Sequence, residues 1–133
     1  MISIKLTSVI VDDQAKALAF YTDILGFVLK QDIPMGGARW LTVVSAADPD
    51  GVHLLLEPCG FEFAKTYQKA LYDAGVPLTA FAVDDLPAEY ERLRELGVAF
   101  RGEPTTGPGP ATALLDDTCG NLIQLFEVAK TAA

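Results

Sequence analysis

The 133-residue sequence contains one histidine, two cysteines and one tryptophan. A single histidine, His53, excludes any metal site that takes two or three imidazoles from one chain. Cys59 and Cys119 are too few for a disulfide framework in a chain of this length, and their spacing matches no zinc motif. We therefore expect two reduced, inert thiols and a cytoplasmic protein.

Basic residues are also scarce: 10 Lys and Arg stand against 18 Asp and Glu, a formal net charge of −8. A negative field of this sign repels phosphate backbones and anionic lipid headgroups, so nucleic acid is not an expected partner. No apolar run approaches the roughly 18 residues that a membrane span requires, and no signal peptide is recognised at the N-terminus. Half of the residues are hydrophobic, which suffices for the core of one folded domain over 1–133.

The most informative feature that is present is an internal repeat. The segment Leu78-Thr-Ala-Phe-Ala-Val-Asp-Asp85 matches Leu6-Thr-Ser-Val-Ile-Val-Asp-Asp13 at five of eight positions, with a constant offset of 72. Each copy predicts a strand that ends at the Asp pair and a helix that follows it. The aspartates are expected to cap these helices, since carboxylates accept hydrogen bonds from free N–H groups at helix starts.

Hydrophobic spacing and turn residues predict the other elements of each copy. The first copy is expected to contain a strand over 4–11, a helix ending at Gly26, strands over 27–31, 40–45 and 52–57, and a loop over 33–37. The second is expected to contain a strand from Leu78, a helix over 86–96, and strands over 98–101, 112–115 and 122–126, after a connecting helix over 61–75. Tyr21, on the first helix, is expected to be a buried ring.

Both copies therefore follow the order β-α-β-β-β. We call 2–58 the first module and 77–128 the second module. Neither module is large enough to bury its own sheet, so the two are expected to pair. The predicted fold class is α+β: two tandem βαβββ modules forming a curved mixed sheet arrangement around a cavity, with the helices outside.

Several short motifs connect this repeat with a known family. They are Ile10-Val-Asp-Asp-Gln14, Ala17-Leu-Ala-Phe-Tyr21 and Leu25-Gly-Phe27 in the first module, and Val83-Asp-Asp85, Tyr90-Glu-Arg-Leu93, Leu96-Gly-Val98 and Gly120-Asn-Leu-Ile-Gln124 in the second. In this order they resemble the vicinal oxygen chelate superfamily, which includes glyoxalase I, bleomycin-resistance proteins and extradiol dioxygenases. The resemblance covers nearly the whole chain and implies a homodimer, which exposed sheet edges make physically reasonable.

The resemblance also indicates where a metal would be held. Enzymes of the superfamily usually bind a divalent metal with one residue from each of four strands. These positions fall on Leu6, Leu55, Leu78 and Gln124 in this sequence. The leucines have no lone pair to donate, and Gln124 is a neutral oxygen donor. The resemblance therefore predicts that the usual metal site is absent and that no cofactor is bound.

The same four positions instead predict a ligand cavity with an apolar floor and Gln124 as a polar handle. Arg39 and Trp40 follow a Gly-Gly loop and are further candidates, since a guanidinium and an indole ring bind aromatic or carboxylate ligands by charged hydrogen bonds and stacking. The alternatives are a core position for Trp40 and a surface charge for Arg39. The expected function is binding of a small, largely apolar or aromatic molecule in a metal-free cavity.

A second function hypothesis is a metal-dependent lyase, isomerase or dioxygenase of the glyoxalase type that uses unusual ligands, such as His53, Glu57 or Gln124. His53 and Glu57 are expected on one face of a strand but about 13 Å apart, at the usual rise of about 3.3 Å per residue, so they cannot share one ion. A third possibility is that the fold serves association alone. The sequence does not choose a ligand or a reaction.

Overall fold

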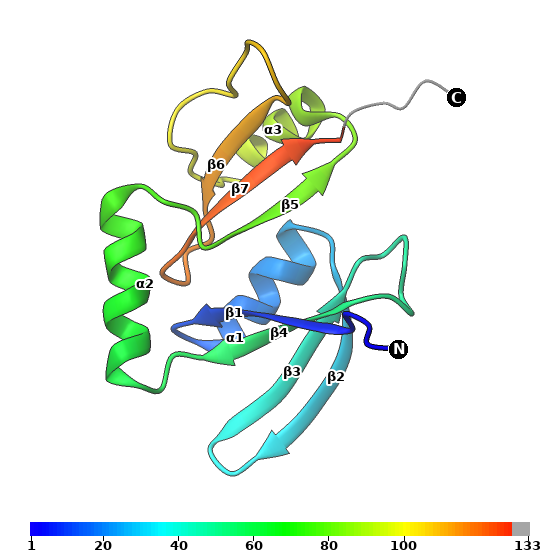
Figure 1. Ribbon diagram of the computed structural model, residues 1–133, viewed down its shortest axis with the longest axis vertical. Coiled ribbons are helices and arrows are strands. Elements are labelled where there is room, and N and C mark those ends of the chain that lie inside the picture. The colour runs from blue at the N-terminus through cyan, green and yellow to red at the C-terminus, as the bar shows by residue number, and fades with distance from the viewer. Residues whose placement is uncertain (129–133) are drawn as a thin grey trace.

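The computed structural model describes residues 1–128 and contains two mixed sheets. The first sheet has the order β1-β4-β3-β2 and comprises β1 (Leu6–Val11), β2 (Val28–Met35), β3 (Ala38–Val44) and β4 (His53–Pro58). The second has the order β5-β7-β6 and comprises β5 (Thr79–Val83), β6 (Thr112–Asp116) and β7 (Leu122–Glu127) (Figure 1). The tail over 130–133, for which fraying is predicted, lies outside the described residues.

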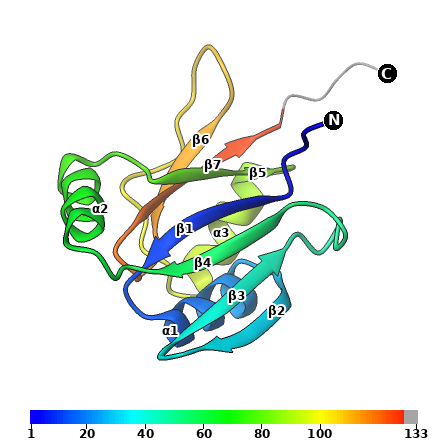
Figure 2. The ribbon, with the colours of Figure 1, turned by 60° about the horizontal axis from the view of Figure 1, so that its bottom comes forward.

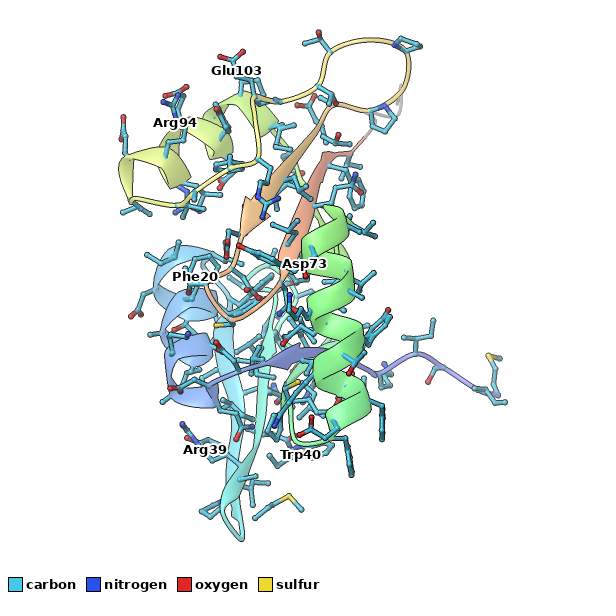
Figure 3. All side chains as sticks on the ribbon, turned by 90° about the vertical axis from the view of Figure 1, so that its left-hand side faces the viewer. Phe20, Arg39, Trp40, Asp73, Arg94 and Glu103 are labelled. Atoms are coloured by element: carbon cyan, nitrogen blue, oxygen red, sulfur yellow. The ribbon has the colours of Figure 1, made fainter. Side chains whose placement is uncertain are left out.

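Three α-helices accompany the sheets: α1 (Gln14–Ala19), α2 (Glu62–Ala74) and α3 (Leu86–Glu95). The helix α1 continues as a π-helical turn, η1 (Phe20–Ile24). Figure 3 shows α1 and α3 on the same side of the two sheets, and Figure 1 shows α2 running along one end of both. No helix within residues 1–128 combines the length and the hydropathy that crossing a membrane requires.

The internal repeat forms the same local structure twice. Asp13 Oδ1 accepts a hydrogen bond from Lys16 N at 3.0 Å, and Asp85 Oδ1 accepts one from Ala88 N at 3.1 Å. The predicted capping roles of these aspartates are therefore confirmed. After each helix the chain turns at a glycine with φ of +90°, Gly26 in the first module and Gly97 in the second.

Strand β2 is longer than predicted. The expected loop over 33–37 is wrong as far as Met35, because Ile33 pairs with Trp40 and Met35 with Ala38. The turn consists of Gly36 and Gly37 alone, whose φ values are +52° and +87°. Two glycines with positive φ form a tight hairpin whose twist matches the flanking strands, so both strands run up to the turn.

The predicted strand over 98–101 is wrong as a regular strand. Only Phe100 forms a β-bridge there, with Leu115 of β6. Arg101 N donates to a β6 carbonyl at 2.8 Å, and Gly102, with φ of +90°, then turns the chain. The second sheet therefore has three strands where the first has four.

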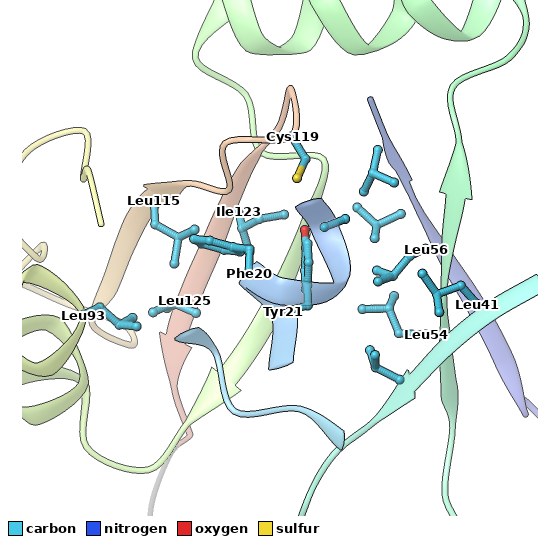
Figure 4. Packing of buried hydrophobic residues seen from close by; sticks show 14 of the residues in the cluster. Phe20, Tyr21, Leu41, Leu54, Leu56, Leu93, Leu115, Cys119, Ile123 and Leu125 are labelled. Atoms are coloured by element: carbon cyan, nitrogen blue, oxygen red, sulfur yellow. The ribbon is translucent and has the colours of Figure 1, made fainter. Parts of the chain in front are cut away.

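The hydrophobic core lies between the sheets, on the side that α1 and α3 cover. Phe20 and Tyr21 of η1 are inserted between side chains of the two sheets (Figure 4). The buried side chains that surround them include Val9, Leu41, Leu54, Leu56, Leu115, Ile123 and Leu125. Burial of each such side chain contributes about 1.5–3 kcal/mol, so this shared core holds the two modules together.

The opposite surface of the first sheet, which faces away from this core, is called the open face here. Side chains alternate between the two faces of a strand. On β1, Val9 and Val11 are fully buried in the core, whereas Leu6 is 46% exposed. The strand pairing adds the open-face residues of β3 and β4, which are Trp40, Thr42, His53, Leu55 and Glu57. The order of the helices and strands and the two mixed sheets confirm the predicted α+β fold of tandem βαβββ modules.

Candidate ligand-binding site

A pocket of about 360 Å³ lies on the open face at the start of β1 and β4. Leu6 and His53 are direct partners in the parallel pairing of these strands, so both border the pocket. Trp40 of β3 forms another wall. Two of the six predicted ligand-binding residues, Leu6 and Trp40, are thus brought together from segments more than thirty residues apart.

Trp40 is held in position by its own polar group. Its indole N–H donates to Gln31 Oε1 on β2 at 2.9 Å, and the residue is half-buried. A buried or half-buried indole usually finds such a partner, which leaves its ring to contact apolar groups. The side chain therefore presents a fixed aromatic surface to the pocket rather than a mobile one.

Leu55 lies beside the pocket residues on the same face. Its register partners are Ser8 on β1 and Thr42 on β3, and it is 9% exposed. Thr42, which is fully buried, contacts His53 Nδ1 through its hydroxyl at 3.2 Å. The open face thus combines an apolar floor at Leu55 with a histidine whose ring position is set by a neighbouring strand.

Arg39 points to the other side of the sheet from Trp40. Its Nε and Nη2 donate to the two carboxylate oxygens of Asp32 at 3.0 and 2.7 Å, and these hydrogen bonds lower the pKa of Asp32. Its backbone carbonyl and N–H both bind the Gln14 side chain. Figure 3 shows Arg39 and Trp40 on opposite sides of the ribbon, so they do not act on one ligand together.

The two remaining predicted residues belong to the second module. Gln124 is half-buried and pairs with Ala80 on one side and Leu114 on the other. Leu78 precedes β5 and is partly buried against the hydrophobic core. Neither lines the pocket at Trp40. The six predicted residues therefore fall into a group of three on the open face (Leu6, Trp40 and Leu55) and three separate positions.

Two charged residues of the pocket were not predicted from the sequence. Lys5 borders it just before β1, and Asp50 borders it from the loop before β4. Asp50 is also 3.5 Å from Lys30 Nζ, an exposed ion pair of small energetic weight. The segment 46–51, which joins the strands predicted over 40–45 and 52–57, carried no signal in the sequence that it returns to Trp40.

Metal ligation was assessed from the arrangement of acidic, histidine and cysteine side chains. Within residues 1–128 no three or more of them are grouped as a metal ion would need. His53 and Glu57 share the open face as expected, and Glu57 is exposed. Gln124, the third suggested ligand, is on the other sheet.

A buried polar network joins the two modules near the end of β1. Asp117, fully buried, accepts hydrogen bonds from the Tyr21 hydroxyl at 2.6 Å, from Cys119 N at 2.7 Å and from Asn121 N at 3.0 Å. Burial raises the pKa of Asp117, and these hydrogen bonds oppose that shift. The predicted burial of Tyr21 is confirmed, and the residue is a structural link between modules.

The Gln68 side chain connects α2 to the same network. Its Nε2 is 3.0 Å from the Ile10 carbonyl and 3.0 Å from Asn121 Oδ1. Asn121 Nδ2 also donates to the Ile10 carbonyl, at 2.7 Å. The end of β1 is thus fastened by side chains from the connecting helix and from the second module.

Neither thiol has the environment of a nucleophile. Cys119 is buried, and burial raises its pKa to about 12. Burial also raises the pKa of Cys59, which is half-buried. A raised pKa reduces the thiolate fraction at neutral pH, in agreement with the inert thiols expected from the sequence.

The match to a protein family agrees with this fold. Residues 3–125 match the family described as Glyoxalase/Bleomycin resistance protein/Dioxygenase superfamily. Because the match covers most of the chain, the protein belongs to that superfamily.

Individual relatives cover almost the same length. The chain is 52% identical over 124 residues to the uncharacterized protein YurT of Bacillus subtilis (strain 168), covering 93% of this chain and 98% of YurT. Among solved structures, UcmS2 superposes with a TM-score of 0.81 at 31% identity, covering 95% of this chain and 98% of UcmS2. TnmS3, an antibiotic binding protein from Streptomyces sp. CB03234, superposes with a TM-score of 0.75 at 32% identity, covering 97% of this chain and 98% of TnmS3.

Proposed function

We propose that the protein binds a small, largely apolar or aromatic molecule at the open-face pocket, without a metal ion. The observation that carries the proposal is the anchored Trp40 ring beside Leu6 and His53, in a pocket of about 360 Å³. Ligand sites of this kind combine apolar walls with a few fixed polar groups. Here the apolar walls are Trp40 and Leu6, and the polar groups are His53, Lys5 and Asp50.

Two further observations support a binding role. The positions at which the superfamily usually places metal ligands hold three leucines and Gln124, and these favour an apolar ligand over a coordinated ion. TnmS3, which this chain resembles over nearly its whole length, is an antibiotic binding protein. The class of ligand proposed here is correspondingly a small organic molecule.

The metal-dependent alternative has less support. Its three suggested ligands are divided between the two sheets, since His53 and Glu57 are on β4 and Gln124 is on β7. Elemental analysis after purification without chelator separates the two hypotheses. Less than about one-tenth of a divalent ion per chain is expected, and about one tightly bound ion per chain would refute metal-free binding.

The proposal includes a homodimer. The edge strand β2 leaves Val28, Leu29, Ile33 and Met35 between 45 and 59% exposed, and the start of the chain leaves Ile2 and Ile4 still more exposed. Exposed apolar side chains on a sheet edge favour pairing with a second copy. Sedimentation velocity is expected to give twice the chain mass, and a monomer at micromolar concentration would reject this part. Cytoplasmic localisation stays a prediction from the sequence.

Trp40, the only tryptophan, makes the pocket directly observable. Titration with 1-anilinonaphthalene-8-sulfonate, a bulky aromatic probe, is expected to quench the Trp40 emission by energy transfer. Calorimetry on Trp40→Ala should then show binding weakened about tenfold or more, the size typical of an aromatic anchor. Arg39→Ala is the matched control, since its side chain is on the other face, and its affinity should stay within twofold. Equal losses in both variants, or no quenching, would contradict the assigned site.

A further inference from the structure

A larger cavity, of about 570 Å³, lies away from the open-face pocket and shares no residue with it. Leu25, Phe27 and Ser45 of the first module form one wall. The other walls come from β5, β7 and α3 of the second module. Its volume is within the roughly 300–1,000 Å³ of small-molecule sites, and sites of that kind are often found where two units meet.

The inner wall of this cavity is aromatic. Phe27 and Phe81 meet edge to face with ring centroids 5.1 Å apart. Behind them Tyr21 lies 6.4 Å from Phe27 and 6.3 Å from Phe81, so the three rings form one packed group across the modules. Leu93 and Leu125, both almost fully buried, extend the apolar surface. Such a wall accepts a ring or alkyl chain.

The rim of the cavity is acidic. Asp84, Asp85 and Glu89 line it together with one cation, Arg92. The Arg92 guanidinium is already engaged, because it donates twice to Glu89 Oε2, at 3.1 and 2.8 Å, and once to the Ile24 carbonyl at 3.1 Å. Its charge is therefore matched by Glu89, and the two aspartates leave the rim negative.

The start of α3 does not offer this rim an anion site. Ala88 N donates to Asp85 Oδ1 at 3.1 Å, and Leu86 N donates to Glu127 Oε2 at 3.0 Å. The N–H groups that bind anions at other helix starts are thus occupied by the protein's own carboxylates. Asp84 is exposed, and within residues 1–128 no hydrogen bond or ion pair engages its carboxylate.

We propose that this cavity is a second binding site, which takes a small organic cation with an aromatic or apolar body. The ammonium group is held at the rim by Asp84, and the body enters against Phe27 and Phe81. The site is independent of the proposed function, because the two cavities have no lining residue in common.

The test uses three ligands of similar size but different charge: 2-phenylethylammonium, 2-phenylethanol and 3-phenylpropanoate. Calorimetry or chemical-shift titration of the whole chain is expected to rank their affinities in that order. Asp84→Asn should weaken the ammonium ligand roughly two- to fivefold, the range of an exposed ion pair, and leave the alcohol unchanged. Glu103→Gln removes the same charge from an exposed loop and should change neither affinity.

The cavity itself is tested by filling it. Ala88→Phe places a ring at the rim from α3 and should weaken 2-phenylethylammonium by more than tenfold. Ala70→Phe makes the same change on an exposed position of α2 outside the cavity and is the control. Both variants are checked by circular dichroism, and Asp84→Asn, an exposed substitution, tests the site even if Ala88→Phe does not fold.

Three results would overturn the proposal. The first is no binding of 2-phenylethylammonium at millimolar concentration. The second is an equal or tighter affinity for the carboxylate, which would remove the role of the acidic rim. The third is the same affinity in Asp84→Asn and Glu103→Gln, which would show that the overall negative charge of the chain, not this cavity, attracts the cation.

Discussion

The two modules use the same helix start and the same glycine turn, but they differ in the segments that follow. In the first module β2 and β3 form a hairpin of eight and seven residues. In the second the corresponding segment pairs only through Phe100. The hairpin carries Trp40, whereas the larger cavity opens beside β5 and α3. The open-face pocket therefore depends on a hairpin that the second module lacks, whereas the larger cavity is lined by segments of both modules.

The turns before the last strands differ as well. In the first module the turn over 46–50 is exposed. In the second, Asp117 and Asn121 turn inward and bind Tyr21 and the Ile10 carbonyl of the first module. The comparison shows an asymmetric dependence, since the first module is completed by side chains of the second.

The largest loss of stability is expected when this dependence of the first module on the second is removed. Asp117→Ala removes the acceptor of the Tyr21 hydroxyl and of two buried N–H groups, which are then left without partners. A loss of about 3 kcal/mol in the free energy of unfolding is expected, measured by urea denaturation. Asp48→Ala in the exposed turn of the first module is the control and should cost less than about 0.5 kcal/mol. Equal costs would show that the turns are equivalent.

The next effect tests the shared glycine turns. Gly26→Ala and Gly97→Ala each force a Cβ into a backbone with φ of +90°, although no atom within 4 Å of either would clash with it. The cost is therefore that of the backbone alone, about 1–2 kcal/mol in each module. Gly60→Ala, where there is also open space but no positive φ, should be nearly neutral. Clearly different losses of thermal stability in Gly26→Ala and Gly97→Ala would show that the two turns are not equivalent.

A smaller effect is expected at the helix caps. Asp13→Ala and Asp85→Ala remove the cap of α1 and of α3, each at a cost of about 1 kcal/mol. The preceding aspartates serve as controls, because Asp12 makes only an exposed ion pair and Asp84 is exposed. A cost at Asp12 or Asp84 as large as at its neighbour would argue against capping.

The smallest expected effect is a dependence of the folding stability on pH. Burial raises the pKa of Asp117 in the folded protein, so the folded state takes up a proton more readily than the unfolded state does. The stabilisation from this proton is complete below the unfolded pKa and is lost as pH rises through the folded pKa. Chemical unfolding between pH 3.5 and 7 should show the wild type gaining stability over Asp117→Asn as pH falls. A constant difference, or one that narrows in acid, would contradict the assigned shift.

The fold could be predicted because its signals are local and repeated. The Asp pairs, the glycines after the helices and the alternation within β1 and β5 all act over a few residues. The strand predicted over 98–101 is wrong because the composition of this segment suits a strand, whereas strand pairing depends on where Gly102 turns the chain.

The candidate site could be predicted only in part. Leu6, Leu55 and Trp40 share a face because strand alternation is regular. Arg39 does not, since β3 begins at Ala38, two residues before the predicted start, and adjacent strand residues point to opposite faces. The cavity at Phe27 and Phe81 arises where segments more than 50 residues apart in the sequence pack together, which no local pattern encodes.

The fastening of β1 by Gln68 and Asn121 has a consequence for synthesis on the ribosome. Residues up to Pro58 emerge first, so the whole first sheet is available before the second module exists. The Ile10 carbonyl then stays hydrated until α2 and the turn at Asn121 have been translated. Because N-terminal segments fold first during translation, the first module folds before the contacts that fasten β1 exist. These contacts form only after the second module has been translated.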